Sequence, residues 1–71
     1  MTQCEKVLKH LKERGGITSL EAMQNYGIMR LASRVNDLRR QGVPIRTAYI
    51  TGKNRYGEKI HFTEYFLEEE A

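Results

Sequence analysis

The sequence predicts an α+β domain in which three helices precede a C-terminal β-hairpin. Apolar residues recur at helical spacing as far as Gln41, whereas the segment beyond Pro44 is rich in β-branched and aromatic residues. The chain has 71 residues, and a chain of this length buries only about 60% of the surface that it exposes when unfolded. We therefore expect residues 1–71 to form a single small domain, with no room for a second.

The first helix is expected over residues 3–14. Thr2 and Glu5 have the spacing of a capping box at its start, and the glycines at 15 and 16 end it. Four apolar residues fall on one helical stripe: Cys4, Val7, Leu8 and Leu11.

A second capping box, Thr18 with Glu21, opens a shorter helix. Ile17 lies alone between the glycines and this box, so we expect it to pair as a strand of one or two residues. Asn25-Tyr26-Gly27 interrupts the helix after barely two turns, and a tight turn is predicted there. The apolar residues of this helix are Leu20, Ala22 and Met23.

A third helix is predicted over about residues 29–41. It ends at Gln41-Gly42, where arginines in the last turn suit the helix dipole, and Pro44 prevents its continuation. Its apolar stripe consists of Leu31, Ala32, Val35 and Leu38.

Residues 45–67 are predicted to form a β-hairpin with its turn between Gly52 and Gly57. The register is not determined, because Ile45 and Ile50 have opposite parity along the strand. One face is uniformly apolar only if the strand contains a bulge or a strong twist.

Several classes of protein are excluded by composition. Cys4 has no partner for an internal disulfide, and we expect His10 and His61 to be surface residues with no zinc-ligand spacing around them. We find no phosphate-binding loop, nucleophile motif or paired carboxylates, so we predict no catalytic residue, no cofactor and no metal. No apolar run approaches the roughly 20 residues that span a bilayer, and there is no signal peptide, so a cytoplasmic location is expected.

The charge is unevenly distributed along the chain. The formal net charge is only +3. Residues 29–60, however, contain eight lysines and arginines against Asp37 and Glu58, whereas residues 61–71 contain four glutamates and no lysine or arginine. The basic charge is therefore concentrated on the third helix and the hairpin, which favours an anionic partner.

The helix, tight turn, helix and terminal hairpin resemble the winged helix-turn-helix family of DNA-binding domains. The most specific part is LASRVNDLRRQGVPI at residues 31–45, which is similar to small winged-helix proteins of bacteriophages and prophages. The resemblance implies that residues 29–41 are the recognition helix, which enters the major groove, and that residues 52–57 are the tip of the wing. Met23 and Ser33 depart from the simplest helix-turn-helix pattern, which has Ala and an apolar residue there. A turn of different length moves those roles to Ala22 and to Leu31 or Val35, as winged variants allow.

The residue types of the third helix support this interpretation. With Leu31, Val35 and Leu38 facing the core, the rotation of 100° per residue places the polar residues on the opposite side and its flanks. Arginine forks onto guanine and asparagine pairs with adenine in the major groove. Arg39 is expected to be structural, and arginines on a helix face are by themselves more often simply solvated. The candidate DNA-binding residues of the helix are Arg30, Ser33, Arg34, Asn36, Asp37 and Arg40, and those of the wing are Lys53, Asn54, Arg55 and Tyr56.

Two hypotheses about function follow. The first is sequence-specific binding of double-stranded DNA by a transcriptional regulator, or by a recombination or architectural factor, of phage or prophage origin. The alternative is a winged-helix module for protein–protein interaction that does not bind DNA, with the acidic tail at residues 68–71 contacting a partner. Because no long helix with heptads is available for a coiled coil, we expect a monomer or a weak homodimer.

Overall fold

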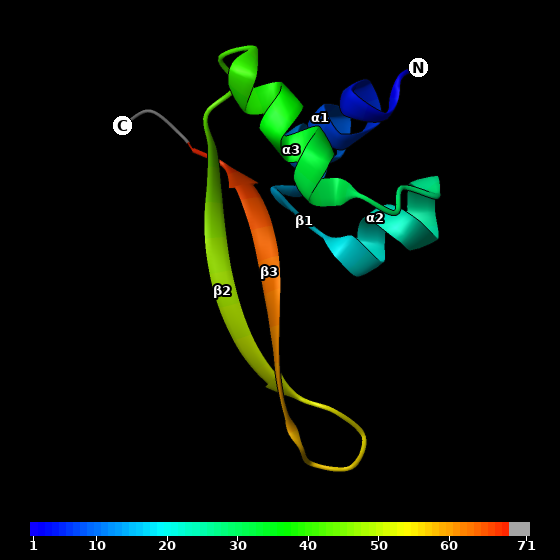
Figure 1. Ribbon diagram of the computed structural model, residues 1–71, viewed down its shortest axis with the longest axis vertical. Coiled ribbons are helices and arrows are strands. Elements are labelled where there is room, and N and C mark those ends of the chain that lie inside the picture. The colour runs from blue at the N-terminus through cyan, green and yellow to red at the C-terminus, as the bar shows by residue number, and fades with distance from the viewer. Residues whose placement is uncertain (69–71) are drawn as a thin grey trace.

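The computed structural model describes residues 1–68 and contains three helices and a three-stranded antiparallel sheet (Figure 1). The predicted α+β fold class is confirmed, including the short strand at Ile17. The elements in chain order are α1 (Gln3–Arg14), β1 (Gly16–Thr18), α2 (Ser19–Tyr26), α3 (Leu31–Arg40), β2 (Ile45–Lys53) and β3 (Lys59–Leu67). Of the predicted acidic tail, residues 69–71 lie outside the described residues.

Both predicted capping boxes are present. At α1, the Thr2 hydroxyl accepts from the Glu5 amide and the Glu5 carboxylate accepts from the Thr2 amide, each over 3.1 Å. Thr18 and Glu21 make the same reciprocal pair at α2. The hydrogen bond from the Thr2 backbone holds the pKa of the Glu5 carboxyl below its ordinary value. This cap therefore weakens as the pH falls through the lowered pKa of Glu5, because the protonated carboxyl accepts poorly.

Helix α3 is shorter than the predicted 29–41, since it begins at Leu31 and ends at Arg40. Ile28 explains the late start. Its side chain is buried in the core, and its amide donates to the Ala22 carbonyl of α2. These contacts hold residue 28 in the turn that follows α2, so α3 begins only at Leu31. Ala32 is exposed, contrary to the predicted stripe, because it lies about 100° around the helix from Leu31.

The core collects one or more buried side chains from every element except β3. Three residues from α3 and two from α1 form its centre, where the two helices pack on one another. Its members are Val7, Leu11, Ile17, Ala22, Ile28, Leu31, Val35, Leu38 and Ile45, and Tyr65 and Leu67 of β3 pack against them half-buried. The core thus ties the base of the hairpin to the helices.

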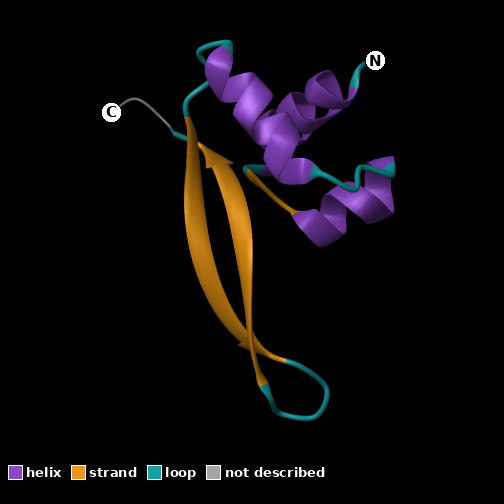
Figure 2. Ribbon diagram, in the orientation of Figure 1, coloured by secondary structure: helices purple, strands orange, loops and turns teal. Residues whose placement is uncertain are grey.

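The sheet has the order β1-β3-β2, and β2 pairs with β3 in one continuous register from Ile45↔Leu67 to Lys53↔Lys59. No bulge interrupts this pairing, so Ile45 and Ile50, which have opposite parity, lie on different faces of the hairpin. Ile45 lies on the face that packs on the helices, and Ile50 lies on the opposite face. We call these the helix-side face and the outer face. Most of the hairpin extends beyond the helices (Figure 2).

His10 is a core residue, which corrects the expectation that it lies at the surface. Its side chain is 4% exposed. Nδ1 lies 2.6 Å from the Tyr26 hydroxyl, and the two rings meet edge to face with centroids 5.5 Å apart. Nε2 lies 3.8 Å from a carboxylate oxygen of Glu21 and makes no hydrogen bond within the described residues. His10 is buried because this polar contact between α1 and α2 satisfies its Nδ1.

The Tyr26→Phe substitution should lower stability by about 1–3 kcal/mol, because it leaves a buried imidazole nitrogen without its hydrogen bond. For a domain of this size, each kcal/mol lowers Tm by about 4–8 °C, which thermal unfolding monitored by circular dichroism will detect. Tyr49→Phe is the matched control, since Tyr49 is 86% exposed. Equal melting curves for the two variants would contradict a stabilising role for the His10–Tyr26 hydrogen bond.

Candidate nucleic-acid interface

Helix α3 directs three polar side chains away from the core. Leu31, Val35 and Leu38 are buried, which leaves the opposite side of the helix to solvent. Three predicted site residues lie on that side: Ser33, Asn36 and Arg40. The side chain of Arg40 is 82% exposed.

Arg34 and Asp37 lie on the flank of α3 that faces α1. An Arg34 guanidinium nitrogen is 3.2 Å from one carboxylate oxygen of Asp37, and the Cys4 sulfur of α1 lies 4.0 Å from the same oxygen. Asp37 also lies 3.9 Å from the Arg40 guanidinium. Asp37 thus stands between two arginines, closer to α1 than the helical wheel suggests, and it orients them at the edge of the exposed side.

Arg30 precedes α3 as its N-cap residue and is exposed. Its side chain makes no capping hydrogen bond, so the first amides of α3 are not satisfied by a side chain. A shallow hollow of about 240 Å³ opens there, lined by Gln3, Gly27, Met29, Arg30 and Arg34.

Arg39 joins α3 to the hairpin, as predicted for a structural residue. Its Nε and Nη2 both donate to the Ile45 carbonyl, over 3.2 and 2.9 Å, and Nη2 also donates to the Thr47 hydroxyl over 2.8 Å. The guanidinium carbon lies 5.9 Å from the centroid of the Tyr65 ring, within the range of a cation–π contact. These contacts fix the angle between α3 and the base of the wing.

At the wing tip, Asn54 makes hydrogen bonds within the turn. Its side-chain oxygen accepts from the amides of Tyr56 and Glu58, both over 3.0 Å, and its side-chain nitrogen donates to the Glu58 carboxylate. Gly57 adopts a positive φ of 77°, which closes the turn. Asn54 therefore shapes the tip, while Lys53, Arg55 and Tyr56 are exposed around it.

The helix-side face of the hairpin adds polar residues that sequence reasoning did not select. Beyond the core contacts at its base, this face carries hydroxyl, imidazole and ammonium groups toward the tip. Its exposed members are Tyr49, Thr51, Lys53, Lys59 and His61. Their alternate spacing was visible in the sequence, but their common face required the register.

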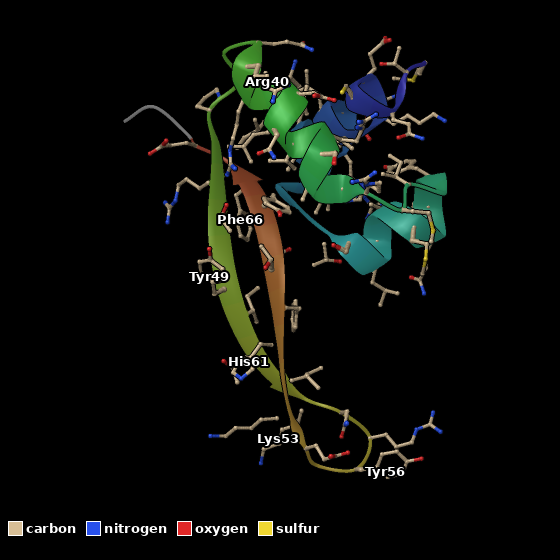
Figure 3. All side chains as sticks on the ribbon, in the orientation of Figure 1. Arg40, Tyr49, Lys53, Tyr56, His61 and Phe66 are labelled. Atoms are coloured by element: carbon tan, nitrogen blue, oxygen red, sulfur yellow. The ribbon has the colours of Figure 1, made fainter. Side chains whose placement is uncertain are left out.

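The candidate site residues form two groups. Figure 3 places Arg40 near one end of the molecule and Lys53 and Tyr56 near the other, with Tyr49 and His61 along the hairpin between them. The α3 residues and the tip residues thus lie at the two ends of an extended surface, with the polar helix-side face of the hairpin between them, and they do not form a pocket. Within residues 1–68, no three side chains of the metal-binding types cluster together.

The sequence matches the winged helix-turn-helix domain family over residues 2–70. The chain therefore belongs to this family, and the resemblance inferred from its residues is confirmed. Domains of this fold bind DNA in general and are typically not enzymes. The search of curated proteins found no match. Within the part of the chain that the structure describes, no helix is long and apolar enough to cross a membrane.

The Arg39→Ala substitution should destabilise the domain by about 1–2 kcal/mol, because three charge-assisted hydrogen bonds between α3 and β2 are lost. Urea unfolding at constant m-value measures the change. Arg40→Ala is the matched control and should change stability by less than about 0.5 kcal/mol, as is usual for an exposed side chain. If Arg39→Ala were as neutral as the control, the anchoring role would be wrong.

Proposed function

We propose that this protein binds double-stranded DNA sequence-specifically, with α3 in the major groove and the hairpin against the DNA backbone. One observation carries the proposal. The side of α3 that faces away from the core presents Ser33, Asn36 and Arg40, whose side chains are suited to reading base edges. Arg30 and Arg34 flank this side and supply further donors to bases or phosphates.

In this proposal the wing supplies affinity that does not depend on sequence. Lys53 and Arg55 neutralise phosphates near the tip, and Tyr56 bonds or stacks against a sugar or phosphate. Asn54, although predicted as a contact residue, acts chiefly by holding the turn in shape. Lys59, Thr51 and His61 extend the contact along the helix-side face of the hairpin.

The start of α3, which no side chain caps, favours an additional phosphate contact, since a helix N-terminus carries partial positive charge. Arg30 stands at this N-terminus. A phosphate bound there would set the depth at which α3 enters the groove. Asp37 would then contribute to specificity by accepting from a cytosine amino group.

The biological role that we propose is that of a transcriptional regulator, or of a recombination or architectural factor, from a phage or prophage. The support is the likeness of residues 31–45 to small proteins of that origin. Selection of bound duplexes from a random pool tests the specificity. A recovered consensus supports sequence-specific binding, whereas enrichment without a consensus would limit the protein to non-specific binding.

Substitutions on α3 and on the wing should have different effects. Asn36→Ala should weaken binding to the selected duplex by about 1–3 kcal/mol and leave binding to a scrambled duplex unchanged, because it removes a base contact. Lys53→Ala combined with Arg55→Ala should weaken both and reduce the slope of log K against log salt by about 2, because two phosphate contacts are lost. Fluorescence anisotropy at several salt concentrations measures both effects.

A control variant separates local contacts from total charge. Lys9→Ala with Lys12→Ala removes two exposed lysines from α1, away from α3's outward side and the wing. It should leave the salt slope nearly unchanged. If this variant and the wing variant lost the same affinity, the wing would have no specific role in binding.

The second candidate function is a protein-interaction module, and the acidic tail is the feature that favours it. Its glutamates, Glu68, Glu69 and Glu70, carry charge opposite to that of the hairpin. Deleting residues 68–71 distinguishes the two functions. Tighter DNA binding after deletion indicates a tail that competes with DNA, whereas absence of DNA binding in both forms, with loss of a protein partner, would favour the interaction module.

A further inference from the structure

The outer face of the hairpin is apolar and lies apart from the core. Its residues alternate with those of the helix-side face along both strands. Phe62 and Ile60 are 41% and 40% exposed, and neither packs against the core cluster. The residues of this face are Arg46, Ala48, Ile50 and Gly52 on β2, and Ile60, Phe62, Glu64 and Phe66 on β3.

The helical core does not cover this face, although the start of α2 borders it: Leu20 lines a hollow of about 580 Å³ together with Ile60 and Phe62. Ile45, Tyr65 and Leu67 of the hairpin meet the helical core on the other side of the sheet. On the outer face, Phe66 and Glu64 fold over Gly16, where a Cβ atom would lie only 2.7 Å from the Phe66 ring. Toward the tip, Ile50, Ile60 and Phe62 are partly exposed.

We propose that two copies of this chain associate through their outer faces. Two-fold symmetric packing of a face on itself is the commonest way in which a protein forms a dimer. The helix-side face and the tip carry the lysines that would repel a second copy. The outer face has one arginine and one glutamate, so it is the part of the hairpin where two basic molecules approach without repulsion.

The strand register of the hairpin favours one orientation of the two copies in the dimer. If the two-fold axis runs parallel to the strands, β2 of one copy lies over β3 of the other. Ile50 then meets the partner's Phe62 at the same level, and Gly52 leaves space for the partner's Ile60. With the strands reversed, Arg46 would be buried against apolar side chains near the partner's tip, which is unfavourable for a charge.

In the favoured arrangement the charges of the face are self-complementary. Arg46 faces the partner's Phe66, because these two residues pair within each hairpin. The partner's Glu64 lies two residues further toward the tip. The two positions are about 7 Å apart along the strand and packed sheets lie about 10 Å apart, a gap that the arginine and glutamate side chains bridge together, so Arg46 reaches the partner's Glu64. Symmetry makes this contact twice. Within residues 1–68, neither side chain has an ion-pair partner in its own chain.

The size of the face indicates a weak dimer. Each strand has nine residues, so the face is about 30 Å long and about 10 Å wide. This footprint is below the roughly 800 Å² per partner that stable complexes bury. Association should therefore be reversible and depend on protein concentration, in line with the expectation of a monomer or weak homodimer.

Sedimentation equilibrium from about 5 to about 500 µM protein, without DNA, tests the proposal. The unaltered chain should show a reversible monomer–dimer equilibrium. Phe62→Glu should raise the dimer dissociation constant about tenfold or more, because it places a charge at the centre of the contact. Tyr49→Glu puts the same charge on the opposite face of the hairpin and should leave the dissociation constant unchanged. Far-UV circular dichroism verifies that both variants fold.

A mixing experiment tests the charge contacts between copies. Arg46→Glu alone and Glu64→Arg alone should each weaken self-association, because each variant places like charges opposite one another. In an equimolar mixture the two variants should form a heterodimer at least as readily as the unaltered chain forms a homodimer, since both contacts again join opposite charges. A contact between Arg46 and Glu64 of the same chain would not produce this result, because mixing the two variants does not restore a contact inside either chain.

Several outcomes would overturn the proposal. They are a monomer throughout the concentration range, self-association that Phe62→Glu leaves intact, and failure of the mixed charge variants to associate. Binding of a monomeric chain to vesicles of anionic lipid that depends on Phe62 would assign the face to a membrane surface and would also overturn it. None of these measurements involves DNA, so they are independent of the proposed DNA binding.

Discussion

The pairing of β1 with β3 is the constraint on which the arrangement of the domain depends. Only three residues pair, Gly16–Thr18 with residues 64–66, but they connect the helical part of the chain to its last strand. Ile17, fully buried, stands opposite Tyr65 in this pairing and enters the core. A two-stranded ribbon is marginally stable alone, so the third strand and the core beneath it give the hairpin a fixed base. The exposed part of the wing extends from this base.

The orientation of α3 follows from the same core. Three buried residues fix which side of the helix faces inward, and Ser33, Asn36 and Arg40 face outward as a consequence. Adjacent arginines then have different roles. Arg39 lies on the side toward β2 and bonds to Ile45 and Thr47, whereas Arg40 points to solvent. A rotation of 100° between neighbours thus separates an anchoring residue from a candidate contact residue.

The hairpin has two chemically different faces because its register is continuous. Hydroxyl, imidazole and ammonium groups share the helix-side face, and Ile50, Ile60 and Phe62 share the outer face. The first face suits a hydrated polyanion, and the second suits another apolar surface. A shift of one residue in the register would mix the two sets and remove both properties. Ile45 and Ile50 have opposite parity because Ile45 packs into the core at the base of the strand, whereas Ile50 lies on the outer face of the projecting wing.

The sequence by itself determined the features that depend on near neighbours along the chain. The capping boxes, the glycine stops after α1 and α2, the hairpin turn and, except for Ala32, the apolar stripe of α3 were predictable, because the residues that form them lie within a few positions of each other. The concentration of basic charge on residues 29–60 was equally plain. Only the tertiary structure decided what distant segments do to one another. His10 is buried because Tyr26 lies 2.6 Å from it, and Asp37 is drawn toward α1, where its carboxylate lies 4.0 Å from the Cys4 sulfur. The faces of the hairpin were decided by pairing between strands, because local periodicity defines two sets of residues but does not say which set meets the core.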